Sequence, residues 1–308
     1  MTTTEPNALL ALSGELSAAV ARVAPSLVYV DGSARRDATG VVWSAGTIVT
    51  VDHTLERDDE IALVPEGGRR IDATVAGRDP STDLAVLHAT VDLPAAPRSA
   101  RNDLAVGHVV LAAGRDEDGV LGASFGIVSV LDGPWRTWRG GEIDTLIRPD
   151  LTLYAGFSGG PLLDATGALL GINTWGLSRR TALTIPLKTV ARVVEQLETR
   201  GSIARGYLGV ALQDVRLPEA IRAALGAGRR HAAIVVDVAP GGPAERAGLA
   251  LGDVLLAIGD TAIEGADDVQ RALGGDTIGK RTTIEILRGG ARQAVAATIG
   301  ERPNRDDE

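Results

Sequence analysis

The sequence of 308 residues contains no cysteine and few aromatic residues. Without cysteine, the chain has no disulfide bond and no thiolate ligand for a metal. Phe, Trp and Tyr together make up 3% of the residues, whereas 44% of the residues are hydrophobic. The hydrophobic cores must therefore be built mainly from Val, Leu, Ile and Ala, and there are enough of these for packed domains.

An excess of basic residues is also missing, and histidine is scarce. The formal net charge is −9, whereas nucleic-acid binding and membrane-surface binding favour basic patches. The four histidines are scattered and lack the H-x-x-x-H spacing that is typical of a metal site. We therefore expect no nucleic-acid partner, no metal and no cofactor.

Long hydrophobic runs are absent as well. After the first 25 residues, no apolar run approaches the ~18–20 residues that cross a bilayer as a helix. The first 25 residues lack a basic start, and Glu15 interrupts their short apolar stretch, so they do not have the pattern of a signal peptide. These features predict a cytoplasmic chain without a membrane span. Removal of an export signal from a periplasmic or secreted protein would leave the same pattern.

The pattern of apolar residues predicts two domains, as the length also suggests. Residues 7–24 carry a helical stripe that ends at Pro25. Short β-branched runs then recur about every ten residues up to Pro186, a spacing typical of an all-β barrel or sandwich. An amphipathic helix over 186–201 ends at Gly201. We expect the first domain to span residues 1–201.

A turn with the sequence GFSGGP, at residues 156–161, presents a single serine, Ser158, at the base of a predicted hairpin. A serine hydroxyl is a weak nucleophile until a positioned base takes its proton. The backbone N–H groups of Gly156 and Ser158 could together hold the oxyanion of a tetrahedral acyl intermediate. The alternative is an ordinary β-turn with a solvated serine.

His53 and Asp83 are the candidates to serve this serine. His53 ends the apolar run 48–53, and Asp83 directly precedes the run 84–88. Taken alone, each is more often structural, the histidine at a strand end and the aspartate as a turn cap. Together with Ser158 they give the order His, Asp, Ser with separations of 30 and 75 residues. That order is the chymotrypsin-like one, and neither subtilisins nor α/β-hydrolases share it.

Residues 206–300 predict a smaller α/β domain. Its opening loop, Tyr207, Leu208, Gly209 and Val210, could point successive backbone N–H groups at the terminal carboxylate of a peptide, while the peptide adds as a strand beside 210–212. In the alternative interpretation the loop is a packing turn with Tyr207 in the core. The charged tail 301–308 is predicted to be disordered.

A resemblance to the HtrA (DegP-like) trypsin-fold serine proteases is carried by the segments TGVVWSAGTIVTVDHTL, DPSTDLAVLHA, FGIVSVL and GFSGGPLLDATGALLGINT. The run PGGPAERAGL followed by GDVL resembles a PDZ domain of the bacterial protease-associated type. The resemblance implies a mainly β protein, with a trypsin-like double β-barrel followed by a small α/β PDZ domain. It also implies a triad of His53, Asp83 and Ser158 in the cleft between the barrels.

The function that this resemblance implies is an ATP-independent serine endopeptidase that acts on unfolded or misfolded proteins in protein quality control. Its partners would be unfolded polypeptides, C-terminal peptides at the PDZ domain and further copies of the chain in a homotrimer. Residues 172–175 and 181–185 would line the specificity pocket. Because residues 172–185 include no acidic side chain, we expect cleavage after small or medium aliphatic residues.

Three positions depart from the family pattern. Asp52 precedes His53 where a small or amide-bearing residue is common, and Phe157 replaces the usual Asn before the serine. The segment before the turn is Tyr154-Ala155-Gly156 instead of N-P-G. These departures leave open a second function, a PDZ-based chaperone or scaffold with a dormant protease site. We also hypothesise that the Asp52 carboxylate raises the pKa of His53. The alternative is that it points away into water, as strand alternation favours.

Overall fold

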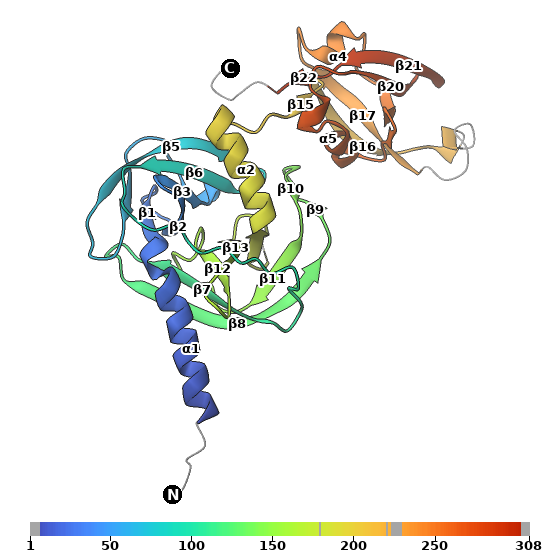
Figure 1. Cartoon of the computed structure of the whole chain (residues 1–308). Coiled ribbons are helices and arrows are strands. Elements are labelled where there is room, and N and C mark those ends of the chain that lie inside the picture. The colour runs from blue at the N-terminus through green and yellow to red at the C-terminus, as the bar shows by residue number, and fades with distance from the viewer. Residues whose placement is uncertain (1–6, 179, 220, 223–229, 303–308) are drawn as a thin grey trace, which may run out of the picture. The chain divides into compact units, whose positions relative to one another are not determined.

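The computed structural model describes residues 7–302, except residues 179, 220 and 223–229 (Figure 1). The chain divides into two compact units, Met1–Ile203 and Ala204–Glu308. The division falls within the short segment that separates the two predicted domains.

The first unit contains two closed β-barrels of six strands each, which confirms the predicted mainly β, double-barrel fold. The first barrel has the strand order β1-β2-β3-β6-β5-β4. Its strands are β1 (Leu27–Asp31), β2 (Ala38–Ser44), β3 (Thr47–Thr50), β4 (Ile61–Val64), β5 (Ile71–Asp79) and β6 (Leu84–Ala89). The β-branched runs of the sequence form these strands, and their Val, Ile, Leu and Ala side chains fill the barrel core.

The second barrel has the order β11-β14-β13-β12-β7-β8. Its strands are β7 (Val109–Arg115), β8 (Leu121–Asp132), β11 (Leu146–Asp150), β12 (Pro161–Asp164), β13 (Leu169–Thr174) and β14 (Leu183–Pro186). A small two-stranded sheet, β9 (Trp135–Arg136) and β10 (Glu142–Ile143), lies between β8 and β11 in the chain. Closing both sheets into barrels removes their free edges.

Two α-helices frame the barrels. Helix α2 (Leu187–Arg200) buries one face, formed by Val190, Val193, Val194 and Leu197, and ends at Gly201, which is left-handed with φ 69°. Helix α1 (Ala8–Val23) begins at Asn7, whose side chain caps the N–H groups of Leu9 and Leu10. Both helices lie where the sequence predicted them.

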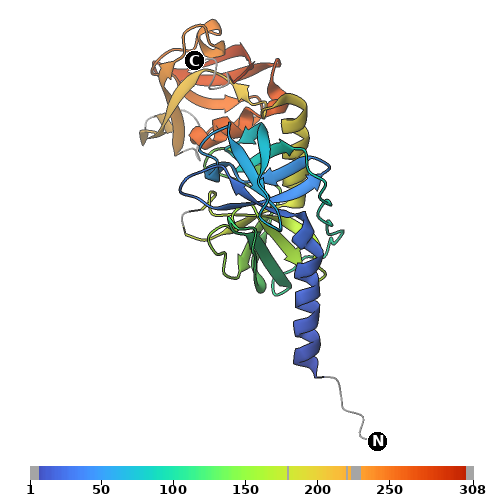
Figure 2. The same cartoon turned by 90° about the vertical axis from the view of Figure 1, so that its left-hand side faces the viewer.

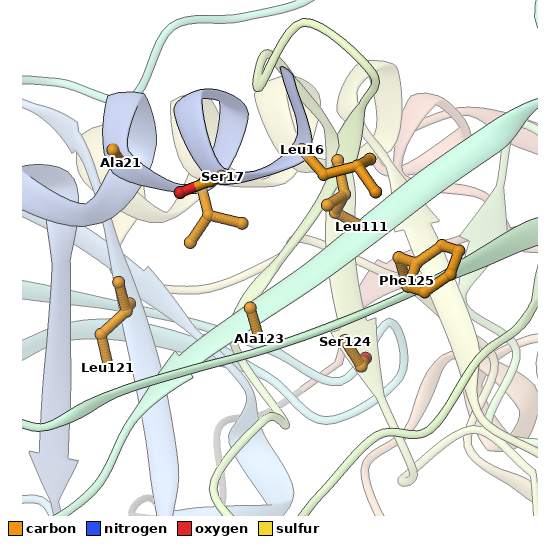
Figure 3. Close-up of a pocket in the computed structure, with 9 residues that line it drawn as sticks. Leu16, Ser17, Ala21, Leu111, Leu121, Ala123, Ser124 and Phe125 are labelled. Carbon is orange, nitrogen blue, oxygen red and sulfur yellow. The ribbon is translucent and has the colours of Figure 1, made fainter. Parts of the chain in front are cut away.

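Only the second half of α1 is covered by the barrels, and its first half projects from them (Figure 2). Ala19 and Val23 are buried, whereas Leu9 and Leu10 are 77% and 71% exposed. An apolar groove of about 420 Å³ lies between the helix and strands β7 and β8 (Figure 3). Its lining includes Leu16 and Val20 of α1 and Phe125 of β8.

The segment Ala8–Ser26 is, by length and composition alone, helical and apolar enough to cross a membrane. The expectation of a chain without a membrane span did not take this segment into account, and a single helix of this kind is weak evidence against that expectation. Glu15 and Arg22 are its two charged residues, and the small Ala, Ser and Gly residues between the leucines do not lower its hydropathy enough to exclude it. The same test is passed by signal sequences and by buried core helices, and Ala19 and Val23 do lie in the core.

The second unit is built on a β-sheet with the order β16-β17-β18-β20-β21, so β16 lies at an edge. Its main strands are β16 (Val210–Arg216), β17 (His231–Val238), β18 (Val254–Ile258), β20 (Arg281–Arg288) and β21 (Ala291–Thr298), and β19 (Thr261–Ala262) pairs with β18. Its helices include α4 (Pro243–Arg246) and α5 (Ala266–Ala272). An aliphatic cluster that includes Leu208, Leu255 and Ile286 fills its core.

A two-stranded sheet joins the beginning and the end of this unit. Strand β15 (Gly206–Tyr207) pairs with β22 (Gly300–Glu301), and the N–H of Arg302 donates to the carbonyl of Arg205. The predicted disordered tail 301–308 therefore begins too early, because backbone pairing orders its first two residues. Residues 303–308 lie outside the described part of the chain.

One buried ion pair in the second unit predicts a pH-dependent stability. Asp253 is 1% exposed, and Arg288 donates to its two oxygens at 2.7 and 2.6 Å. These hydrogen bonds lower the pKa of Asp253, so the stabilisation is present above the pKa of the unfolded chain and is lost as the pH falls through the folded value. We expect Asp253→Asn to lower the melting temperature at pH 7 and to lower it much less near pH 3.

The exposed Asp260 offers a matched control. Thermal unfolding of the full chain, with Asp253→Asn and Asp260→Asn compared at both pH values, measures the difference. Equal melting temperatures of the two variants at pH 7 would contradict a stabilising role for the Asp253 carboxylate.

Candidate active site

The three predicted catalytic residues lie at strand ends of the two barrels. His53 lies in a short 3-10 turn, Asp52–Thr54, after β3, and Asp83 directly precedes β6. Strands β3 and β6 are hydrogen-bonded neighbours, so residues 30 positions apart meet at one end of the first barrel. Ser158 lies in the turn before β12 of the second barrel.

The Asp83 carboxylate holds the imidazole of His53 by several hydrogen bonds. His53 Nδ1 lies 2.8 Å from Asp83 Oδ2 and 3.0 Å from Oδ1, and the His53 N–H donates to Oδ1 at 2.9 Å. The Thr174 hydroxyl donates to Oδ2. Asp83 is 2% exposed and has φ 61°, a backbone conformation that costs energy in a residue other than glycine. Its surroundings therefore hold it in place against that strain.

Two residues of the second barrel contact the His53–Asp83 pair and support its position. Neither of them was predicted from the sequence. Thr174 ends β13, and Gly176 follows two residues later. A Cβ atom on Gly176 would lie 2.3 Å from Asp83 Oδ2 and 2.7 Å from His53 Nδ1, so any side chain there would displace the pair. The pattern Thr-x-Gly after a buried strand was the available signal, but the sequence analysis assigned 172–175 only to the specificity pocket.

The turn that carries Ser158 leaves two backbone donors unpaired. The Phe157 N–H donates to the Tyr154 carbonyl at 3.1 Å, and Gly156 in the third position has φ 83°, as in a type II turn. The N–H groups of Gly159 and Gly160 also donate to backbone carbonyls. Those of Gly156 and Ser158 have no acceptor in the described part of the chain, which makes them free to bind an oxyanion.

Ser158 itself is 7% exposed. Among the described residues no hydrogen bond joins its hydroxyl to His53. A loose contact between nucleophile and base is common in unliganded hydrolases. The structure thus fixes the His53–Asp83 pair and the backbone of the serine turn, and the Thr39 N–H of the first barrel, which donates to the Ser158 carbonyl, joins this turn to that barrel.

Phe157, the first departure from the family pattern, is a buried anchor of this turn. It is 4% exposed and makes an edge-to-face contact with Tyr154, with ring centroids 5.4 Å apart. Cβ atoms on Gly114 and Gly122 would approach the Phe157 ring to 2.7 and 3.2 Å. Strands β7 and β8 therefore make room for an aromatic ring with two glycines, and the ring fastens the turn to the barrel.

Asp52, the second departure, faces Arg78 and not the imidazole. Its Oδ1 accepts from Arg78 Nε at 2.6 Å, and the same guanidinium donates to the carbonyls of Asp52 and Leu55. Burial raises the pKa of Asp52, while the hydrogen bond and charge of Arg78 act in the opposite direction. The hypothesis that Asp52 acts on His53 has no support in this geometry. The alternative, an Asp52 that points into water, is wrong as well, because Asp52 is 5% exposed and lies with His53 in a 3-10 turn and not in a strand.

In the second unit, the predicted carboxylate loop also has carbonyl groups that accept hydrogen bonds and N–H groups without an acceptor. The carbonyls of Leu208 and Gly209 accept from Ala244 and Ala239, at 2.7 and 2.9 Å. The N–H groups of Leu208 and Gly209 have no acceptor among the residues that the structure describes. Gly209 has φ 80°, and Val210 begins the edge strand β16. This arrangement can receive a carboxylate and, next to it, an added strand.

No group of three or more His, Cys, Asp or Glu side chains that could hold a metal ion occurs within residues 7–302, leaving out the positions not described.

Two closed barrels, a His53–Asp83 pair with a buried carboxylate and a serine turn before β12 are the features of a trypsin-like protease domain. Residues 38–172 match the trypsin-like peptidase domain family, and residues 206–299 match the PDZ domain family. Among solved structures, an HtrA-type protease AlgW with a tripeptide is 32% identical with a TM-score of 0.70, covering 94% of this chain and 98% of that one. A serine endoprotease from Yersinia pestis is 28% identical with a TM-score of 0.72, over the same shares of the two chains.

Curated relatives agree with this class. A probable periplasmic serine endoprotease, DegP-like, of Halomonas elongata is 31% identical over 270 residues, which are 86% of this chain and 56% of the relative. The corresponding protein of Brucella suis is 33% identical over 278 residues, 86% of this chain and 52% of the relative. The chain belongs to the HtrA family of trypsin-like serine proteases. It spans little more than half the length of these curated relatives.

The contact of Asp52 with Arg78 leads to a prediction about the pH dependence of kcat/KM. Because its carboxylate is paired with Arg78, we expect Asp52→Asn to leave the acid limb of the kcat/KM profile in place. That limb reports the protonation of the general base in the free enzyme. Profiles measured at low and high salt provide the test, since a bare charge beside the imidazole would act mainly at low salt.

The exposed Asp58, which also accepts a hydrogen bond from Arg78, is the matched control. Asp58→Asn removes a carboxylate from the same guanidinium without touching the strand end that carries His53. A shift of the acid limb to lower pH in Asp52→Asn alone would contradict the assignment of Asp52 to Arg78.

Proposed function

We propose that the protein is an ATP-independent serine endopeptidase that cleaves unfolded or misfolded polypeptides in protein quality control. The observation that carries this proposal is the multiply hydrogen-bonded His53–Asp83 pair, whose carboxylate is buried, together with a serine turn in which two N–H groups have no acceptor among the described residues. The curated relatives, which are named serine endoproteases, support the same reaction.

In this mechanism Ser158 attacks the scissile carbonyl. His53 accepts the hydroxyl proton and returns it to the leaving amine, while Asp83 holds the imidazole in the correct tautomer and stabilises the imidazolium. The N–H groups of Gly156 and Ser158 bind the oxyanion. Thr174 orients the Asp83 carboxylate. All these groups belong to the chain, so no step calls for a cofactor.

The specificity pocket would be formed by the ends of β13 and β14, over residues 172–175 and 181–185. Ile172, Ala182 and Leu183 are buried there, and Leu153 packs beside Ala182. An apolar lining without an acidic residue favours small or medium aliphatic side chains at the cleavage site.

The second unit would bind the C-terminal ends of polypeptides. Its edge strand β16 is open to a further strand, and the N–H groups of Leu208 and Gly209 would receive the terminal carboxylate. The related AlgW structures hold a decapeptide and a tripeptide. A homo-oligomer, in particular a trimer, is proposed from the family alone.

We propose a periplasmic or secreted location, because the curated relatives are named periplasmic. The expectation of a cytoplasmic chain rests on the pattern of the first residues and finds no support among these relatives.

A PDZ-based chaperone or scaffold with a dormant site is the second candidate function. It is favoured by one observation, that no hydrogen bond joins the Ser158 hydroxyl to His53 in the part of the chain that the structure describes. A fluorophosphonate probe, which reacts covalently with an activated serine, separates the two functions. Labelling of the wild type that Ser158→Ala removes indicates a competent site.

The nucleophile gives the most direct prediction. Ser158→Ala should lower the cleavage of unfolded casein by about 10⁴-fold or more, because the loss of a triad nucleophile leaves only residual catalysis. The fold should persist, since the hydroxyl makes no hydrogen bond with the described residues. Cleavage near the wild-type rate, in preparations made from a host without contaminating proteases, would rule out Ser158.

The carboxylate loop gives a second prediction. A peptide with an apolar C-terminal residue should bind to the full-length protein, and amidation of its C-terminus should weaken binding by about 10-fold or more, since it removes charge-assisted hydrogen bonds. Calorimetric titration of the Ser158→Ala protein avoids cleavage of the ligand. Equal affinity for the free acid and the amide would contradict the loop assignment and leave the protease assignment untouched.

A further inference from the structure

Thr39, in β2 of the first barrel, is fully buried, and its polar groups bind the serine turn of the second barrel. Its N–H donates to the Ser158 carbonyl at 2.9 Å, and its hydroxyl donates to the Gly156 carbonyl at 2.7 Å. These are the carbonyls of the two residues whose N–H groups would bind the oxyanion. The hydroxyl and the backbone N–H of Thr39 therefore hold the turn at Gly156 and at Ser158.

The planarity of the peptide bond explains how a held carbonyl aims an N–H group. In a trans peptide the C=O and N–H point in opposite directions, so a bond at each end fixes the whole plane. The Gly156–Phe157 peptide is held by the Thr39 hydroxyl at its C=O and by the Tyr154 carbonyl at its N–H. The Ser158–Gly159 peptide is held by the Thr39 N–H at one end and by the Asn173 carbonyl at the other.

The peptides that carry the two unpaired N–H groups alternate with these fixed planes. The Phe157–Ser158 peptide is held at its C=O by the Gly160 N–H, at 3.0 Å, which leaves the Ser158 N–H aimed outward. The Ala155–Gly156 peptide has no hydrogen bond of its own to any residue that the structure describes. Its direction therefore depends on the next plane, whose carbonyl the Thr39 hydroxyl holds.

The remaining bonds of Thr39 connect the turn to the strand that leads to His53. The Thr39 carbonyl accepts from the Thr50 hydroxyl at 2.9 Å, and Thr50 ends β3, three residues before His53. The Thr39 hydroxyl also accepts from the Arg115 N–H at 3.0 Å. Thr39 thus joins the nucleophile side of the site to the base side.

The serine turn and Thr39 are in close contact. A Cβ atom on Gly159 would lie 2.1 Å from the Thr39 carbonyl, and one on Gly160 would lie 3.4 Å from the Thr39 Cβ. The serine turn therefore packs directly on this residue. Loss of the hydroxyl would leave the Gly156 carbonyl and the Arg115 N–H without a partner in a buried place.

We infer that Thr39 is a positioning residue for catalysis, which holds the oxyanion-binding N–H groups and Ser158 in register with His53. The inference rests on the proposed function, because it assigns a role within the same reaction. Thr39 does not touch the substrate. Its hydroxyl acts through the backbone of Gly156, and its N–H through that of Ser158.

The test compares Thr39→Val with Thr39→Ser in the full chain. Valine keeps the branched shape and lacks the hydroxyl, whereas serine keeps the hydroxyl and lacks the methyl group. We expect Thr39→Val to lower kcat by about 10- to 100-fold with KM within about 3-fold of the wild type, because small displacements of catalytic groups act on the transition state. Thr39→Ser should retain most of the activity.

A second measurement reports on the oxyanion site directly. The affinity for a peptide aldehyde, whose adduct with Ser158 places an oxygen in that site, should fall in Thr39→Val by about as much as kcat/KM. Thr47→Val is the matched control, since Thr47 is a buried threonine of β3 whose hydroxyl donates to Glu198 on α2. Melting temperatures of all variants identify any general loss of stability. If Thr39→Val does not fold, Thr39→Ala takes its place.

The outcomes separate the two proposals. A wild-type protein that neither cleaves peptides nor reacts with a fluorophosphonate overturns the proposed function, and this inference with it. An active wild type together with an unchanged kcat in Thr39→Val overturns the positioning role alone. The same holds if Thr47→Val lowers kcat equally, or if Thr39→Ser is no more active than Thr39→Val.

Discussion

The buried carboxylate of Asp83 is the interaction on which the site depends. An ionised carboxylate away from water is costly unless hydrogen bonds satisfy it. Here the donors come from both barrels, the His53 backbone from the first and the Thr174 hydroxyl from the second. This arrangement around Asp83 can therefore form only when the two barrels are packed together, and the proposed triad depends on that packing.

A second constraint follows from how closely the barrels approach at the serine turn. The turn packs against the Thr39 carbonyl without space for a side chain at Gly159. On its other side the Phe157 ring fills the space above Gly114 and Gly122. A backbone clamp on one side and an aromatic anchor on the other hold the same short turn. An aromatic residue at position 157 is thus compatible with an ordered turn, because burial of its ring fastens the backbone.

Much of this arrangement could be predicted from the sequence. The period of the apolar residues predicted the strands and helix α2, and the order of His53, Asp83 and Ser158 predicted their grouping. Contacts that depend on strand register could not be predicted.

Arg78 lies 26 residues from Asp52 in the sequence, and only the pairing of β5 with β6 brings it next to Asp52. Thr39 and Thr174 read as ordinary strand residues, since their role comes from the neighbouring barrel. The pairing of β22 with β15 likewise depends on the ends of the second unit coming together.

Closed barrels and an open sheet edge give the two units different responses to unfolded chains. A strand edge with unpaired N–H and C=O groups is a template on which other chains aggregate, and closure into a barrel removes it. An unfolded polypeptide therefore finds no free strand edge on either closed barrel with which it could pair. At β16 it meets an open edge, and the proposed carboxylate loop would let the end of a chain be added there as a strand. The open sheet of the second unit, whose outer strands are β16 and β21, can therefore accept an added strand, whereas the two closed barrels cannot.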